Sequence, residues 1–172
     1  MKKTFILTAF VLLTAIPVFS QTQFEVSTDA KSGDKVMKGI ISRSLLEKEP
    51  SFTWYAEAQK LYSPNEAAVA ALKKNTDSIQ LLVFMGTWCE DSHFVIPRFF
   101  SLLDKSGFPN DKVTLIGVDR DKKTLSHLSE AMNVTNVPTI IVMKNGKELG
   151  RVIEYGNDGL FDKALGEILA GK

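Results

Sequence analysis

The chain has 172 residues, of which 44% are hydrophobic and 24% charged, a composition typical of one globular domain with a modest appendage. Its 21 basic and 20 acidic residues give a formal net charge of +1, and the basic residues are scattered along the sequence. Proteins that bind nucleic acid or anionic membranes carry a clustered positive charge. The composition therefore argues against both of these partner classes.

Residues 1–20 have the layout of a secretory signal peptide. Lys2 and Lys3 form a basic head, an apolar run without any charge covers 5–19, and the small residue Ser20 closes the segment. The run is shorter than the roughly 20 apolar residues of a membrane-spanning helix. No cysteine follows it that a lipid anchor would need. We expect cleavage after Ser20, a periplasmic or secreted product, and no stable membrane insertion after cleavage.

The sequence contains one cysteine, Cys89. An export compartment favours disulfides, yet this chain cannot form one within itself. Cys89 is therefore a buried inert thiol, a site of intermolecular chemistry, or a ligand.

The segment 21–63 is expected to form an N-terminal extension. Its polar first part, 21–34, is typical of a flexible lead-in, and the apolar spacing of 35–46 indicates an edge strand. Residues 51–63 carry four aromatic side chains, which are costly to leave in water and are expected to pack against the domain. A partner-binding surface is the alternative interpretation of this aromatic segment.

The remaining segment, 64–172, alternates between strand and helix patterns. Continuous apolar runs predict buried strands, helical spacing predicts amphipathic helices, and Asn145-Gly146 predicts a hairpin turn. Strands are expected over 79–85, 113–118, 139–143 and 149–153, and helices over 64–74, 92–105, 125–132 and 160–169. This order predicts an α/β domain with a mixed central sheet and helices on both faces.

The motif Trp88-Cys89-Glu90-Asp91-Ser92 lies between the first of these strands and the following helix. It resembles the Trp-Cys-x-x-Cys active-site motif of the thioredoxin family. Three further features stand at the separations found in that family: Pro97, Val137-Pro138-Thr139 and Lys144-Asn145-Gly146-Lys147. The resemblance covers roughly 67–169 and implies a thioredoxin fold.

The resemblance also implies roles for individual residues. Cys89 would attack or accept a disulfide as a thiolate, a form that the free N–H groups at a helix start favour. Trp88 would cover the site, unless it is simply a packing residue. Val137 and a cis Pro138 would form the loop that offers backbone groups to an extended peptide substrate.

Several positions depart from the family pattern. Ser92 replaces the second cysteine, which in thioredoxins resolves the mixed disulfide; its hydroxyl can still donate a hydrogen bond to the Cys89 thiolate. The plainer interpretation of Ser92 is a helix cap or an exposed first-turn residue. Val83 and Leu115 stand where thioredoxins often carry a buried Asp and its partner Lys. Ordinary dithiol chemistry is therefore not expected.

Three neighbours of Cys89 are possible modulators of its reactivity. Glu90 and Asp91 place negative charge beside the sulfur and oppose the helix dipole. His93 lies one helical turn after Cys89, where it can interact with the sulfur or share a metal. The plainer interpretation of His93 is a solvated helix residue.

Three functional hypotheses follow. In the first, Cys89 of an exported, monothiol thioredoxin-like protein exchanges with a thiol- or disulfide-containing protein or a small thiol, and Ser92 stabilises its thiolate, without cofactor or metal. The second is a redox-inactive thioredoxin-fold binding or chaperone-like module. The third is a metal carrier using Cys89 with His93, Asp91 or Met85, but the chain lacks the second cysteine that soft copper sites prefer.

Overall fold

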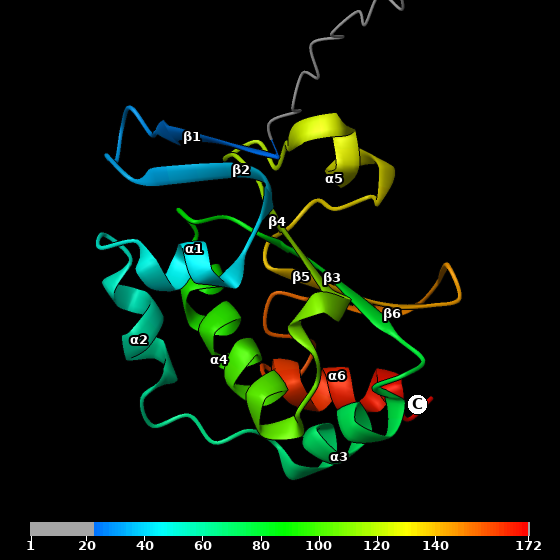
Figure 1. Ribbon diagram of the computed structural model, residues 1–172. Helices are drawn as coiled ribbons and strands as arrows, with labels where there is room; N and C mark the ends of the chain where they lie inside the picture. Colours follow the sequence, from blue (N-terminus) through cyan, green and yellow to red (C-terminus); the bar gives the residue numbers. More distant parts are fainter. Residues whose placement is uncertain (1–22, 172) are drawn as a thin grey trace, which may run out of the picture.

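A computed structural model describes residues 23–171, so the signal peptide expected over 1–20 lies outside the described residues. The described chain forms a six-stranded mixed sheet in the order β1-β2-β4-β3-β5-β6 (Figure 1). The strands are β1 Phe24–Thr28, β2 Lys35–Ile41, β3 Gln80–Met85, β4 Val113–Gly117, β5 Thr139–Lys144 and β6 Lys147–Ile153. The α-helices are α1 Arg43–Lys48, α2 Thr53–Gln59, α3 Glu66–Asn75, α4 Glu90–Ser106, α5 Leu128–Ala131 and α6 Phe161–Leu169.

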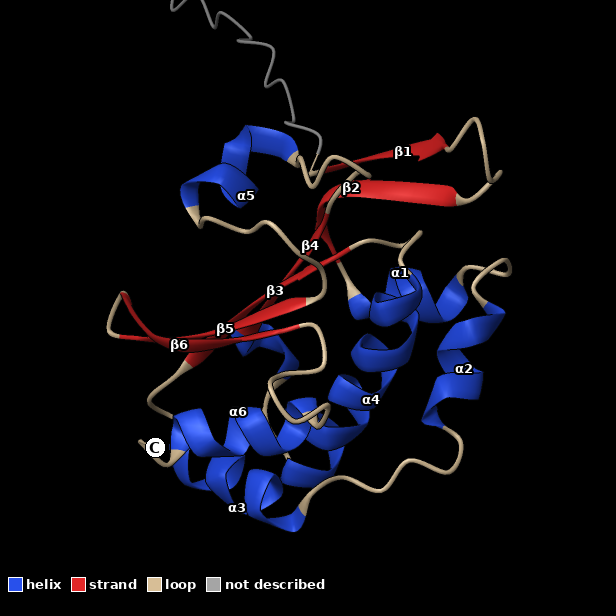
Figure 2. Ribbon diagram, turned by 180° about the vertical axis from the view of Figure 1, so that it is seen from behind, coloured by secondary structure: helices blue, strands red, loops and turns tan. Residues whose placement is uncertain are grey.

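The central strand β3 explains how the core is divided. It pairs in parallel with β4 and antiparallel with β5, and its successive side chains point to opposite faces. Leu81 and Val83 pack into the cluster formed with α1, α2, α3, α4 and α6, whereas Phe84 packs into a smaller cluster under α5. Figure 2 shows this unequal covering of the two faces. The predicted mixed sheet with helices on both faces is confirmed.

The extension is more regular than the sequence predicted. Phe24–Thr28, which we expected to be part of a flexible lead-in, forms β1 and pairs antiparallel with β2. β1 is therefore the edge strand, and β2, predicted at the edge, lies between β1 and β4. The prediction was wrong because four of the five β1 side chains are exposed, which leaves no alternation of buried and exposed residues to detect.

The strand predicted over 35–46 ends at Ile41. Ser42 then caps α1, because its Oγ accepts a hydrogen bond from the Leu45 N–H at 3.3 Å. Leu46 is fully buried as part of this helix, and its apolar character alone did not distinguish helix from strand.

The helix predicted over 125–132 is also shorter than expected. The structure has a 3-10 turn at Leu125–His127 followed by the single turn of α5. Ser126 and His127 both have positive φ angles, 57° and 53°, which interrupt a right-handed helix.

The aromatic segment 51–63 packs against the domain, as predicted. Phe52 and Tyr55 are only 6% and 3% exposed and belong to the main core. The Gln59 side-chain amide donates to the Pro97 carbonyl at 3.2 Å, which attaches α2 to α4. The extension is therefore packed onto the active-site helix.

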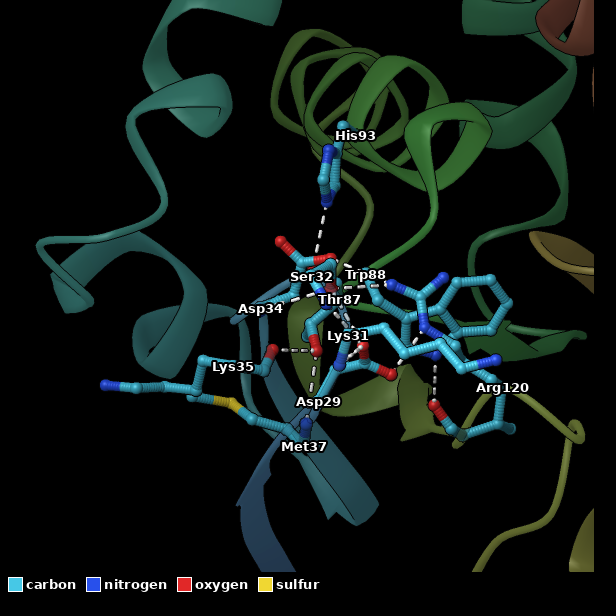
Figure 3. A network of polar contacts seen from close by, with 11 residues as sticks. Asp29, Lys31, Ser32, Asp34, Lys35, Met37, Thr87, Trp88, His93 and Arg120 are labelled. Carbon is cyan, nitrogen blue, oxygen red and sulfur yellow. Dashed lines mark hydrogen bonds and ion pairs between the residues drawn. The ribbon is translucent and has the colours of Figure 1, made fainter.

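Arg120 fastens the loop between β1 and β2 to the loop after β4 (Figure 3). Its guanidinium donates to Asp29 at 2.6 Å, to Ser32 at 2.8 Å and to Asp34 at 2.9 Å. Asp29 also accepts the backbone N–H groups of Lys31 and Ser32. The Ser32 N–H and the Arg120 guanidinium hold the pKa of Asp29 well below its usual range.

Asp29→Asn should lower the free energy of unfolding at neutral pH, because it removes the charged acceptor of Arg120. A carboxyl whose pKa is depressed by folding stabilises the protein above its unfolded pKa, and this stability is lost as pH falls toward the folded pKa. The difference between wild type and variant should therefore shrink as pH falls below about 4, the pKa of an unfolded Asp. Urea unfolding at neutral and acidic pH measures this difference in the free energy of unfolding. A difference that does not change with pH would contradict a stabilising ion pair between Asp29 and Arg120.

Candidate active site

Cys89 lies at the junction of β3 and α4, where it is the N-cap residue of the helix. The side chain is half-buried and makes no capping hydrogen bond, so the N–H groups of the first turn stay available to an anion. The thiol donates to the carbonyl oxygen of Val137, with 3.3 Å between Sγ and oxygen. The structure thus brings Cys89 against the loop to which the family resemblance assigned substrate binding.

That loop presents its backbone to the sulfur. The Val137–Pro138 peptide bond is cis, and the side chains of both residues are buried. The Pro138 carbonyl accepts the Glu154 N–H at 2.7 Å, whereas the Val137 carbonyl faces Cys89. The Val137 carbonyl is therefore the group of this loop that contacts the sulfur.

Ser92 is fully buried, unlike the exposed first-turn residue of the plainer interpretation. Its Oγ accepts the Gly86 N–H at 3.2 Å and so fastens the first turn of α4 to the end of β3. The hydrogen bond found for Ser92 is thus to Gly86 and not to Cys89. Because the hydroxyl oxygen acts as acceptor in this bond, its proton remains free to be donated.

The side chain of Trp88, the residue before Cys89, is held in place by a hydrogen bond and by packing. Its Nε1–H donates to the Val118 carbonyl at 2.9 Å, and its half-buried ring packs into the cluster under α5. The Arg120 guanidinium lies 5.0 Å from the ring centroid, within the range of a cation–π contact. Gly86 makes room for this ring, because a Cβ at that position would lie 2.6 Å from it.

Thr87, which the sequence analysis did not single out, ties the active-site loop to the extension. Its buried hydroxyl donates to the Lys35 carbonyl at 2.7 Å and accepts the Met37 N–H at 3.1 Å (Figure 3). Both partners belong to β2, about 50 residues earlier in the chain. No local pattern marks such a residue, since the contacts form only when the extension folds onto the domain.

His93 is held between two elements and is not a solvated helix residue. Its Nε2 lies 2.8 Å from the Thr87 carbonyl, which can only accept, so Nε2 carries the proton. Its ring stacks on Trp54 of α2, with 4.2 Å between centroids and 13° between planes. The backbone N–H of His93 donates to the Cys89 carbonyl, while the imidazole points toward the extension.

The two acidic neighbours of Cys89 differ in their surroundings. Asp91 accepts a hydrogen bond from the Tyr155 hydroxyl at 2.7 Å. Burial and this bond raise the pKa of Tyr155 to about 12, so the hydroxyl stays a donor at physiological pH. Glu90 is exposed. Tyr155 follows β6 and was not predicted, because only the tertiary fold brings it to α4.

The interior below the site is apolar. Val83 and Leu115 are register partners on β3 and β4 and are 0% and 3% exposed.

Within residues 23–171, no three His, Cys, Asp or Glu side chains lie together as a metal site requires. In the same part of the chain, no helix is long and apolar enough to cross a membrane.

The fold and the site define a thioredoxin-like class, and comparison with known proteins identifies the family. The thioredoxin family model matches residues 63–164, and the chain therefore belongs to the thioredoxin family. The matched region covers most of the domain expected over 64–172, whereas most of the extension lies outside it.

Several thioredoxins are similar to this chain. Thioredoxin of Echinococcus granulosus is 33% identical over 95 residues, which cover 55% of this chain and 81% of that protein. Mitochondrial thioredoxin-2 of Schizosaccharomyces pombe is 25% identical over 140 residues, 78% and 97% of the two chains. Thioredoxin H2 of Arabidopsis thaliana is 30% identical over 90 residues, and this chain spans 63% of its length.

A solved structure supports the fold. The protein of unknown function PA1234 from Pseudomonas aeruginosa has a TM-score of 0.51 at 15% identity, over 74% of this chain and 88% of that one. This likeness concerns the fold alone.

Thr87→Val should lower the free energy of unfolding by on the order of 1–3 kcal/mol, because it leaves a buried N–H and a carbonyl of β2 without their partner. Thr87→Ser is the matched control, since it keeps the hydroxyl. Denaturant unfolding of the two variants measures the effect. Equal stability of the Val and Ser variants would contradict the proposed attachment.

Proposed function

We propose that the protein is an exported, monothiol member of the thioredoxin family in which Cys89 exchanges with a disulfide or thiol of a partner protein or small molecule. The observation that carries this proposal is the position of Cys89 at the start of α4, against the Val137 carbonyl. In this position the N–H groups of the helix favour the thiolate, and the loop offers a backbone acceptor to a bound peptide.

The exchange step needs only Cys89 and a partner disulfide. Cys89 loses its proton to solvent, and the thiolate attacks one sulfur of the disulfide. A bond forms between Sγ and that sulfur, while the second partner sulfur leaves as a thiolate and takes up a proton. The product is a mixed disulfide, and the number of disulfides is unchanged.

Ser92 determines the fate of the mixed disulfide. A hydroxyl cannot displace a thiolate from the mixed disulfide, so the intermediate persists until an outside thiol attacks it. A second thiol of the same partner would attack the partner sulfur, release the Cys89 thiolate and leave a rearranged partner disulfide. A small thiol that attacks the Cys89 sulfur would release the partner thiol and leave a disulfide between Cys89 and the small thiol, which a second small thiol would then reduce. Persistence of the intermediate favours isomerase-like exchange or trapping over net reduction.

The apolar pair below the site has a further consequence. Because Val83 and Leu115 carry no titratable group, protons cannot pass through the interior as they would along a buried Asp and Lys. Proton transfer to and from Cys89 therefore does not run along this pair of positions.

Export rests on the sequence of residues 1–20 and forms part of the proposal. Secretion through a signal peptide predicts a mature chain that begins near Gln21. The mass of the mature protein, purified from the export compartment, tests this; an intact Met1 would contradict it.

A redox-inactive binding module is the second candidate. It is favoured by the carboxylates of Glu90 and Asp91, which flank Cys89 and oppose a thiolate at that position. Cys89→Ser distinguishes the two functions: a binding module still captures its partner after this change and under reducing conditions, whereas a monothiol exchanger loses its covalently captured partner in both cases.

Ser92→Cys should create catalysis of insulin reduction by dithiothreitol that the parent protein lacks, because the new thiol can resolve the mixed disulfide. Ser92→Ala is the matched control, which removes the hydroxyl without adding a thiol. Precipitation of the reduced insulin chain, followed by turbidity, measures the rate. Equal rates for the parent and the Cys variant would contradict the assigned role of Ser92.

A further inference from the structure

Asp91 belongs to the first turn of α4, two residues after Cys89, but its carboxylate does not bind that turn. The N–H groups of residues 90–92 precede the first hydrogen bond of the helix, which His93 donates to the Cys89 carbonyl at 2.9 Å. Acidic side chains near a helix start commonly turn back to such free N–H groups. Within the described residues, the Asp91 carboxylate instead accepts a hydrogen bond from the Tyr155 hydroxyl alone, at 2.7 Å.

The backbone that carries Tyr155 is attached to the loop beside Cys89. The N–H of Glu154 donates to the Pro138 carbonyl at 2.7 Å, and its carboxylate accepts from the Asn136 side-chain amide at 2.9 Å. Both of these partners belong to the cis-proline loop, whose Val137 carbonyl contacts the sulfur. Tyr155 therefore approaches α4 from a position that is fixed relative to the active site.

The side chain of Tyr155 is fixed as well. Its half-buried ring packs against the main core and meets the ring of Phe94 at 63°, with 5.3 Å between centroids. Burial, the hydrogen bond to Asp91 and, to a smaller extent, the charges of Asp91 and Cys89 raise the pKa of Tyr155 to about 12. The hydroxyl is therefore a permanent donor to Asp91 at physiological pH.

We propose that Tyr155 is a positioning residue of the exchange reaction, because its hydroxyl holds the Asp91 carboxylate away from the N–H groups at the start of α4 and leaves these groups to the Cys89 thiolate. The inference rests on the proposed function, since the thiolate is the group that attacks the partner disulfide. Without the hydroxyl, the carboxylate can turn toward the same N–H groups and compete with the sulfur for them. This competition raises the pKa of Cys89 and lowers the fraction of thiolate at neutral pH.

Other charged or titratable side chains near the site come from three elements. They are Glu90, Asp91, His93 and Arg98 on α4, Glu154 and Tyr155 after β6, and Arg120 and Lys122 after β4. The cis-proline loop, 136–139, carries no titratable side chain. A comparison in which only Asp91 and Tyr155 change therefore keeps the contribution of all the other groups constant.

The reaction of Cys89 with 4,4′-dithiodipyridine, measured over a range of pH, tests this proposal. The thiolate attacks one sulfur of this uncharged disulfide and forms a mixed disulfide, while the other sulfur leaves, takes up a proton as thiopyridone and is followed by its absorbance. Four proteins are compared: the wild type, Tyr155→Phe, Asp91→Asn and the variant with both changes. Phe keeps the aromatic ring that packs on Phe94 and removes only the hydroxyl.

Tyr155→Phe should move the midpoint of the pH profile upward and slow the reaction at neutral pH about two- to fivefold, the size of one charge interaction at a helix end. The same change made in the Asp91→Asn protein should leave the midpoint unchanged, because no carboxylate remains to be released. Tyr62→Phe is the matched control, since the Tyr62 hydroxyl donates to Asp162 of α6 at 2.8 Å. It removes the same kind of bond outside the first turn of α4 and should keep the profile of the wild type.

Failure of the role of Tyr155 and failure of the proposed function give different results. An equal rise of the midpoint in both backgrounds would show that Tyr155 acts through packing and would overturn its role, as would an unchanged midpoint in Tyr155→Phe. Either result leaves the proposed function intact, provided that wild-type Cys89 reacts with the reagent. No reaction of the wild-type protein at any pH would overturn the proposed function, and the role of Tyr155 with it.

Discussion

The buried hydroxyl of Thr87 joins the two parts of the molecule on which the site depends. It binds the β2 backbone at Lys35 and Met37, while the carbonyl of the same residue fixes His93. The His93 ring in turn stacks on the ring of Trp54 of α2. Through this chain of contacts the extension is attached to the first turn of α4, the helix that Cys89 caps. Loss of the hydroxyl would therefore affect both the stability of the extension and the shape of the active-site surface.

The chemistry proposed for the site follows from what surrounds one sulfur. Cys89 caps the N-terminal end of α4, and its sulfur contacts the Val137 carbonyl, a backbone acceptor. Ser92 provides a hydroxyl where a resolving thiol would stand, and its oxygen is used to hold Gly86. Together these features favour a long-lived mixed disulfide. A persistent intermediate makes recognition of the partner important.

The sequence predicted the elements of the family fold well and the extension poorly. Apolar runs located β3, β4 and β5, because buried strands leave a strong signal. β1 was missed because its side chains are mostly exposed, and α1 was missed because Leu46 fits a strand as well as a helix. The motif placed Cys89 and Ser92 at the start of α4. Thr87 and Tyr155 could not be found, since only tertiary contacts between distant segments bring them to α4 or its loop, and Trp54 was predicted only as part of an aromatic segment that packs against the domain.

The pH dependence of Cys89 alkylation tests the central claim most directly. Reduced, mature protein is treated with iodoacetamide over a range of pH, and labelling is read from the intact mass. An accessible, activated thiol predicts labelling faster than that of free cysteine at neutral pH. Slow labelling over the whole range would show a shielded or unactivated thiol. That result would contradict disulfide exchange and support the binding module.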